Sequence, residues 1–122
     1  MFSEAVLDHF SHPRNAGELA GATATVEVSN PVCGDVLRLA ARVENGRILE
    51  ARFLCRGCTT SIASASSLTE QISGRTLGEA QSLTQSSLAD GLGGLPPATL
   101  HGAQLAVEAL GALLLKLLPS AR

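Results

Sequence analysis

Four side chains that are able to bind a metal ion lie in three separate segments of the sequence. Cys33 and Asp35 flank Gly34, Cys58 lies near the middle of the chain, and His101 lies in the last segment. Because Gly34 permits a tight turn, Cys33 and Asp35 could both face one point. A thiolate is a soft ligand and a carboxylate a hard one, which suits a metal ion or a reactive thiol. The separations exclude a compact zinc-finger pattern, so from spacing alone a joint site is one hypothesis.

The predicted ends of helices place two of these residues where their chemistry is favoured. Cys58 starts a predicted helix and follows Arg56, so the helix dipole and a neighbouring cation both favour the thiolate. His101 lies in the first turn of the last predicted helix, where the dipole disfavours the imidazolium and leaves a neutral ring. Taken singly, Cys58 could instead be a small buried residue, and His101 a surface residue or a cap.

Other thiols and imidazoles have simpler interpretations. Cys55 and Cys58 form a C-x-x-C pair between a predicted strand and a predicted helix, as in thioredoxin-like motifs. The surrounding chain shows no βαβ pattern, so we interpret Cys55 as an alternating residue at the end of a strand, and a thiol oxidoreductase as an alternative. His9 and His12 are three residues apart near a helix end, and we interpret them as solvated surface histidines rather than ligands.

Length and composition indicate one compact domain over residues 1–122. Hydrophobic residues make up 45% and charged residues 16% of the chain, which argues against disorder. The absence of Trp and Tyr and the net charge of -2 argue against nucleic acid as a partner. Three cysteines and an N-terminus unlike a secretory signal indicate a reduced, cytoplasmic protein. The apolar tract at 100–118 contains several polar residues, so we predict a buried helix and no membrane span.

Local patterns predict an α+β fold with the order helix, sheet, helices. A helix capped by Ser3 is predicted to reach Phe10, with Val6, Leu7 and Phe10 on one face. Three antiparallel strands follow, with a hairpin turn at Asn45-Gly46 between the second and third: 24–29, 36–43 and 47–54. The remaining chain is predicted to be helical: from Gly57 to Ser73, in a short helix capped by Thr76, in a short turn or helix over 84–88, and from Thr99 to Leu118.

Five segments carry recognisable motifs in a fixed order: 2–10, 12–17, 30–35, 57–66 and 95–106. Together they resemble the IscU/NifU N-terminal family, whose members are scaffolds on which iron–sulfur clusters are built and then passed on. The resemblance covers nearly the whole chain. It implies a SufE/NifU-like fold, with a small three-stranded antiparallel sheet packed against an N-terminal helix and several C-terminal helices.

The resemblance also implies a site and a set of partners. Cys33, Asp35, Cys58 and His101 fall on the family's cluster- and zinc-binding positions, which implies iron or a labile [2Fe–2S] cluster as cargo and zinc as an alternative. The implied partners are a cysteine desulfurase, recipient apo-proteins and a chaperone that recognises 95–97. A homodimer around a cluster is compatible with the family. The implied chemistry is ligand exchange, so we expect a scaffold and no enzyme.

Three positions depart from the family pattern. Gly102 stands where the family has a third cysteine, Ala98-Thr99 replaces the usual end of the chaperone segment, and Phe2 replaces a tyrosine. Two thiolates, a carboxylate and an imidazole suit zinc, mononuclear iron or a labile [2Fe–2S] cluster. Cys55 is a candidate replacement thiolate. The alternative function is a degenerate zinc-binding or regulatory homologue that interacts with the assembly machinery without building clusters.

Overall fold

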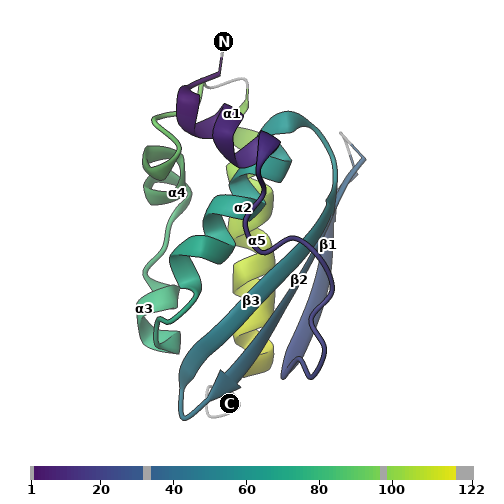
Figure 1. Cartoon of the computed structure of the whole chain (residues 1–122), viewed down its shortest axis with the longest axis vertical. Helices are drawn as coiled ribbons and strands as arrows, with labels where there is room; N and C mark the ends of the chain where they lie inside the picture. The colour runs from purple at the N-terminus through teal and green to yellow at the C-terminus, as the bar shows by residue number, and fades with distance from the viewer. Residues whose placement is uncertain (1, 32–33, 97–98, 118–122) are drawn as a thin grey trace.

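The computed structural model describes residues 2–31, 34–96 and 99–117, and it has the predicted α+β order (Figure 1). Its three strands form one antiparallel sheet in the order β1-β2-β3, with the helices before and after it. The elements are α1 (Glu4–Ser11), β1 (Ala24–Asn30), β2 (Asp35–Glu44), β3 (Arg47–Arg56), α2 (Thr59–Ile72), α3 (Leu77–Gln81), α4 (Gln85–Gly91) and α5 (Leu100–Leu117).

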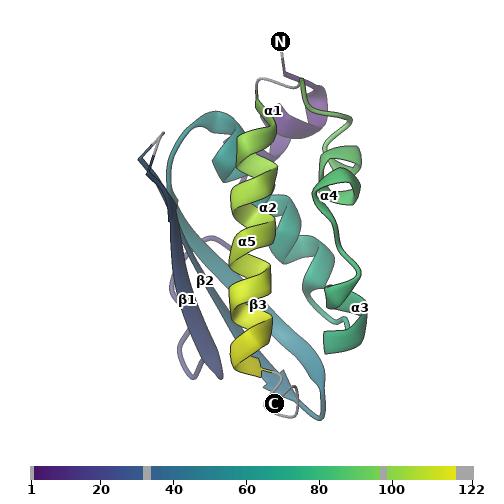
Figure 2. The ribbon, with the colours of Figure 1, turned by 180° about the vertical axis from the view of Figure 1, so that it is seen from behind.

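The helices cover one face of the sheet in two layers (Figures 1 and 2). Helix α5 packs against β1 and β2, α2 packs against β3, and α3 and α4 lie on the far side of these two helices. The opposite face of the sheet is crossed by the segment between α1 and β1. There the Gly17 N–H donates to the carbonyl oxygen of Phe53 at 2.8 Å. The core therefore lies between the sheet and the α2–α5 pair.

Alternating side chains explain why the strands form this sheet. Val26, Leu39 and Phe53 belong to the core, as expected when alternate positions of a strand face the helices. The predicted turn is confirmed, because Asn45 and Gly46 have φ values of 54° and 75°, the left-handed conformation that a two-residue hairpin requires. Strand β3 extends two residues beyond its predicted end and includes Cys55.

Caps fix the helix ends close to the predicted positions. The Ser3 hydroxyl accepts a hydrogen bond from the Val6 N–H at 3.1 Å at the start of α1. Thr76 and Thr84 each form a reciprocal capping box at the start of α3 and α4. After α2, Gly74 takes a φ of 85°, the left-handed conformation that commonly ends a helix. Local hydrogen bonding is thus enough to explain these boundaries.

Helix α1 turns a different face to the core from the one predicted. Leu7 and Phe10 are 48% and 41% exposed, whereas Val6 and His9 are buried. The prediction that His9 is a solvated surface residue was therefore wrong, because α2 offers a hydroxyl at this contact: His9 Nδ1 lies 2.8 Å from Ser66 Oγ. Burial, followed by the nearby Arg14 cation, lowers the pKa of His9 below its usual value.

Helix α5 is the long apolar element at the centre of the molecule (Figure 2). Within the described residues it is the one helix that is long and apolar enough to cross a membrane. However, its buried residues, such as Ala106 and Leu113, belong to the core shared with the sheet. The predicted buried helix is thus observed from Leu100 to Leu117, while its predicted last residue, Leu118, lies outside the described residues.

Candidate metal centre

Asp35, Cys58 and His101 converge on one point in the structure. Cys58 Sγ lies 3.4 Å from His101 Nε2 and 3.8 Å from Asp35 Oδ2. One potential ligand atom from each residue lies within 4.8 Å of the other two. Asp35 is buried, His101 is half-buried and Cys58 is exposed, so the cluster opens to solvent on its cysteine side.

The sheet and two helix starts bring these three side chains together. Asp35 begins β2 directly after Gly34, whose φ is 77° and whose N–H donates to the carbonyl oxygen of Asn30. Cys58 is the N-cap of α2, which follows β3. Because the start of β2 pairs with the end of β3, Asp35 lies beside the turn that carries Cys58. His101 comes from the first turn of α5, which packs against α2.

Cys33, the fourth predicted ligand, lies outside the described residues. In the sequence it lies two residues before Asp35, which is one of the three converging residues. Its participation in the site stays a prediction.

Two glycines leave the space that this arrangement needs. A Cβ atom at Gly57 would lie 2.9 Å from Asp35 Cγ, closer than real side chains approach. A Cβ atom at Gly102 would lie 2.8 Å from the backbone carbonyl carbon of Thr60 in α2. Gly102 therefore allows α5 to approach the first turn of α2 closely.

Ser61 is a fourth member of the cluster that the sequence patterns did not single out. Its hydroxyl donates to Asp35 Oδ2 at 2.5 Å and lies 3.4 Å from Cys58 Sγ. The residue is 1% exposed. Its place three residues after the N-cap Cys58 is a signal that could have found it, because this spacing brings a side chain back toward the helix start.

Cys55 is placed beside the cluster but has a different environment. Its half-buried side chain packs against the core. Burial, together with the negative charges of Asp35 and Cys58, raises the pKa of the Cys55 thiol to about 12. A thiol that stays protonated at neutral pH is a poor nucleophile, which argues against a redox pair of Cys55 and Cys58. Cys55 is not among the three converging donors, and its role as a replacement thiolate stays a prediction.

The two donor separations measured from Cys58 Sγ are close to those around a single tetrahedral ion. Ligand atoms around one zinc ion at usual bond lengths lie about 3.4–3.6 Å apart. The separations of Cys58 Sγ from His101 Nε2 and Asp35 Oδ2, 3.4 and 3.8 Å, are close to this range. Sulfur, nitrogen and oxygen donors in one site suit zinc or iron.

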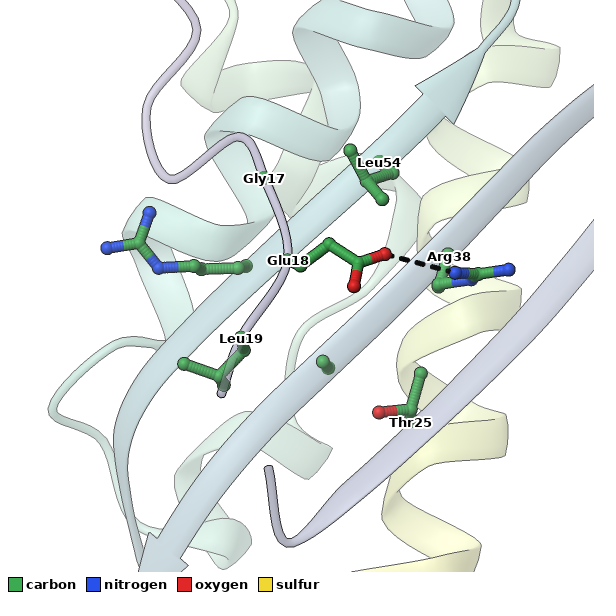
Figure 3. Close-up of a pocket in the computed structure, with 8 residues that line it drawn as sticks. Gly17, Glu18, Leu19, Thr25, Arg38 and Leu54 are labelled. Carbon is green, nitrogen blue, oxygen red and sulfur yellow. Dashed lines mark hydrogen bonds and ion pairs between the residues drawn. The ribbon is translucent and has the colours of Figure 1, made fainter. Parts of the chain in front are cut away.

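A cavity on the other face of the sheet is a weaker candidate for a site (Figure 3). It has a volume of about 180 Å³ and lies between the segment Gly17–Leu19 and the strands. The Arg38 guanidinium already pairs with Glu18 at 3.4 Å, and that of Arg52 pairs with Glu50 at 2.7 Å. Because carboxylates of the chain itself already neutralise these cations, the cavity offers little attraction to an anionic ligand.

The predicted chaperone segment is described only in part. Leu95 packs against the core, whereas Pro97 and Ala98 lie outside the described residues. A cavity of about 410 Å³ separates Leu95 and Leu100 from helix α4. Recognition of this segment by a chaperone stays a prediction.

Comparison with known sequences and structures places the chain among relatives of one kind. The family model described as the NifU-like N terminal domain matches residues 1–117. The chain is 41% identical over 110 residues to the iron-sulfur cluster assembly scaffold protein IscU 1 of Archaeoglobus fulgidus, covering 90% of this chain and 72% of that protein. It is also 41% identical over 118 residues to the iron-sulfur cluster assembly enzyme IscU of Drosophila melanogaster, covering 93% and 76%.

A solved structure shares the fold at low sequence identity. The crystal structure of a candidate scaffold protein of the SUF system from Fervidobacterium islandicum superposes with a TM-score of 0.78 and 22% identity. The match covers 93% of this chain and 96% of that one. The predicted three-stranded sheet with its flanking helices is thereby confirmed.

Proposed function

The chain belongs to the NifU-like N-terminal domain family, and on this basis we propose that residues 1–122 act as a scaffold for iron–sulfur cluster assembly. The observation that carries the proposal is the convergence of Asp35, Cys58 and His101 at one solvent-accessible point. A relative from Archaeoglobus fulgidus with 41% identity is named as such a scaffold. Iron or a labile [2Fe–2S] cluster is the cargo in this proposal.

The proposed site combines the three converging side chains with Cys33 as the fourth ligand. Iron–sulfur clusters are usually held by four cysteines. A set with one carboxylate and one imidazole holds a cluster less firmly, which suits a protein that must release its cargo. The exposure of Cys58 supports exchange of this ligand with an incoming thiolate. The proposed chemistry is thus ligand exchange, although one relative carries the word enzyme in its name.

The proposed partners follow from the cargo. A cysteine desulfurase would deliver sulfur at the exposed Cys58, and recipient apo-proteins would take the cluster by offering their own thiolates. A reduced compartment such as the cytoplasm suits the free thiols of Cys55 and Cys58. We retain the chaperone at Leu95–Pro97 and a homodimer around a cluster as further elements of the proposal.

A second function, a zinc-binding regulator of the assembly machinery, is favoured by two observations. The donor separations at Cys58 match a single tetrahedral ion. The third family thiolate is replaced by Gly102, which packs against α2. Such a protein would bind zinc and the machinery's proteins, but it would retain no sulfide.

Anaerobic reconstitution separates the two functions. The chain is incubated with iron(II), sulfide and thiol, desalted, and assayed for iron, acid-labile sulfide and visible absorption. The scaffold proposal expects iron and sulfide in equal amounts, lost in Cys58→Ala and His101→Ala. Cys55→Ala is the matched control, because it removes a thiol beside the cluster that is not among the three converging donors. Tight zinc with no retained sulfide in the parent would refute the scaffold and support the regulator.

A further inference from the structure

Ser61 contacts two of the three converging side chains without being a usual metal ligand. Its hydroxyl donates to Asp35 Oδ2 and also lies 3.4 Å from Cys58 Sγ. Among the described residues, it is the one hydroxyl that contacts both Asp35 and Cys58. The bond joins the first turn of α2 to the first residue of β2.

The burial of Asp35 gives this bond its importance. Asp35 is 5% exposed, and a carboxylate removed from water needs hydrogen-bond partners. A carboxylate has about four acceptor positions, so the bond from Ser61 leaves others for a metal ion. Without the hydroxyl, the carboxylate would lose a donor that holds it toward Cys58.

The backbone of Ser61 is itself packed closely against α5. A Cβ atom at Gly102 would lie 2.9 Å from the Ser61 backbone nitrogen, so α5 lies directly against this turn of α2. Gly57, which has no side chain, leaves room for the Asp35 carboxylate. The hydroxyl therefore projects from a backbone that is packed between α5 and the cluster.

We propose that Ser61 is a positioning residue of the metal centre, which holds the Asp35 carboxylate toward Cys58 and His101 before the metal ion arrives. This proposal rests on the proposed function, because it assumes that the cluster binds a metal ion. Residues that orient ligands typically contribute about 10- to 100-fold to metal affinity. Ser61 would contribute by keeping three donors within reach of one ion.

The chain contains a matched control for this proposal in Ser64. Both serines lie in α2 and both are buried. The Ser64 hydroxyl has no hydrogen-bond partner among the described residues. Replacement of either serine by alanine removes the same atom from the same helix, but only Ser61→Ala removes a contact to the cluster.

The test measures binding of Co²⁺ alone to the full chain, with zinc competition for the tightest variants. We expect Ser61→Ala to weaken Co²⁺ binding by about 10- to 100-fold and to change the visible Co²⁺ absorption. We expect Ser64→Ala to match the parent in both its Co²⁺ affinity and its visible absorption. In an Asp35→Ala background, Ser61→Ala should cause no further loss, because it acts through the carboxylate. Unchanged affinity in Ser61→Ala, or an equal loss in the Asp35→Ala background, would overturn the proposal.

A second readout in the metal-free chain separates this proposal from the proposed function. Ser61→Ala should lower the Tm of the parent more than that of Asp35→Ala, because the hydrogen bond between Ser61 and Asp35 is already absent in that background. If the parent binds no metal ion through Cys58, the metal site fails, and the positioning role fails with it. If metal binds but Ser61→Ala lowers the Tm of the parent and of Asp35→Ala by equal amounts, Ser61 does not hold Asp35. In that case the positioning proposal alone is overturned.

Discussion

Two glycines of helix α5 provide a sharp test of how closely this helix approaches α2. A Cβ atom at Gly102 would lie 2.8 Å from the carbonyl carbon of Thr60, whereas a Cβ atom at Gly111 would meet nothing within 4 Å. Carbon atoms in contact prefer separations of about 3.5–4.0 Å. A methyl group at position 102 therefore requires α5 and α2 to separate by roughly 1 Å at this point.

The two substitutions should change stability in opposite directions. Overpacking costs about 1–3 kcal/mol, while replacing a helical glycine by alanine contributes about 1 kcal/mol to stability. Gly102→Ala should therefore destabilise the chain by up to about 2 kcal/mol after this gain is subtracted. Gly111→Ala should stabilise it by about 1 kcal/mol. For a chain of 122 residues, each kcal/mol corresponds to about 4 °C in Tm.

The assay is thermal unfolding of the metal-free proteins, followed by circular dichroism at 222 nm and repeated with urea. We expect a Tm up to roughly 8 °C lower for Gly102→Ala and roughly 4 °C higher for Gly111→Ala. A Gly102→Ala protein as stable as Gly111→Ala would refute the close approach of α5 to α2. Gly102→Cys meets the same contact, so we expect it to lose stability too, and not simply to gain a ligand.

Three further predictions test other parts of the structure. Gly57→Ala should weaken zinc binding by about 10- to 100-fold in a competition assay, because its methyl group displaces the Asp35 carboxylate, and unchanged affinity would contradict this. Below about pH 6.5, the free energy of unfolding should fall in urea titrations, since the lowered pKa of His9 makes the unfolded state take up the proton first. His9→Gln should show a smaller pH dependence between pH 7.5 and 5.5, and an equal slope would exclude His9 as the cause. At pH 8, iodoacetamide should alkylate Cys55 on the order of 100-fold more slowly than an ordinary thiol. A pKa of about 12 leaves little thiolate, and the higher nucleophilicity of that thiolate offsets only part of the loss. Mass spectrometry of the Cys55 peptide measures the rate, and alkylation at the rate of an ordinary thiol would contradict this.

The order and type of the elements were predictable because their signals are local. Asn45-Gly46 directs the hairpin through its own left-handed backbone, and Thr76 caps α3 through atoms three residues away. Alternating apolar residues in the strands and the apolar tract of α5 needed no knowledge of distant neighbours. The sequence likewise indicated Asp35, Cys58 and His101 as candidates, because each stands at the end of such an element.

The contacts of α1 could not be predicted in the same way. Periodicity placed Phe10 and Leu7 with Val6, but the structure buries Val6 and His9 and exposes the other two. The choice depends on what α2 presents to α1, which is the hydroxyl of Ser66. A face of a short helix is selected by its neighbour, and the neighbour is far away in the sequence.

Local signals in the sequence predict which elements form and which side chains stand at their ends, since caps, turns and periodicity act within a few residues. The packing of the folded chain then brings ligand atoms from three of those ends within 4.8 Å of one another. It also decided that Ser61 donates to Asp35 and that Gly102 admits α2 so closely. These features depend on how the start of α5 packs on the start of α2 beside the paired β2 and β3. Packing of this kind is set by shape and volume across the fold, which no short stretch of sequence encodes.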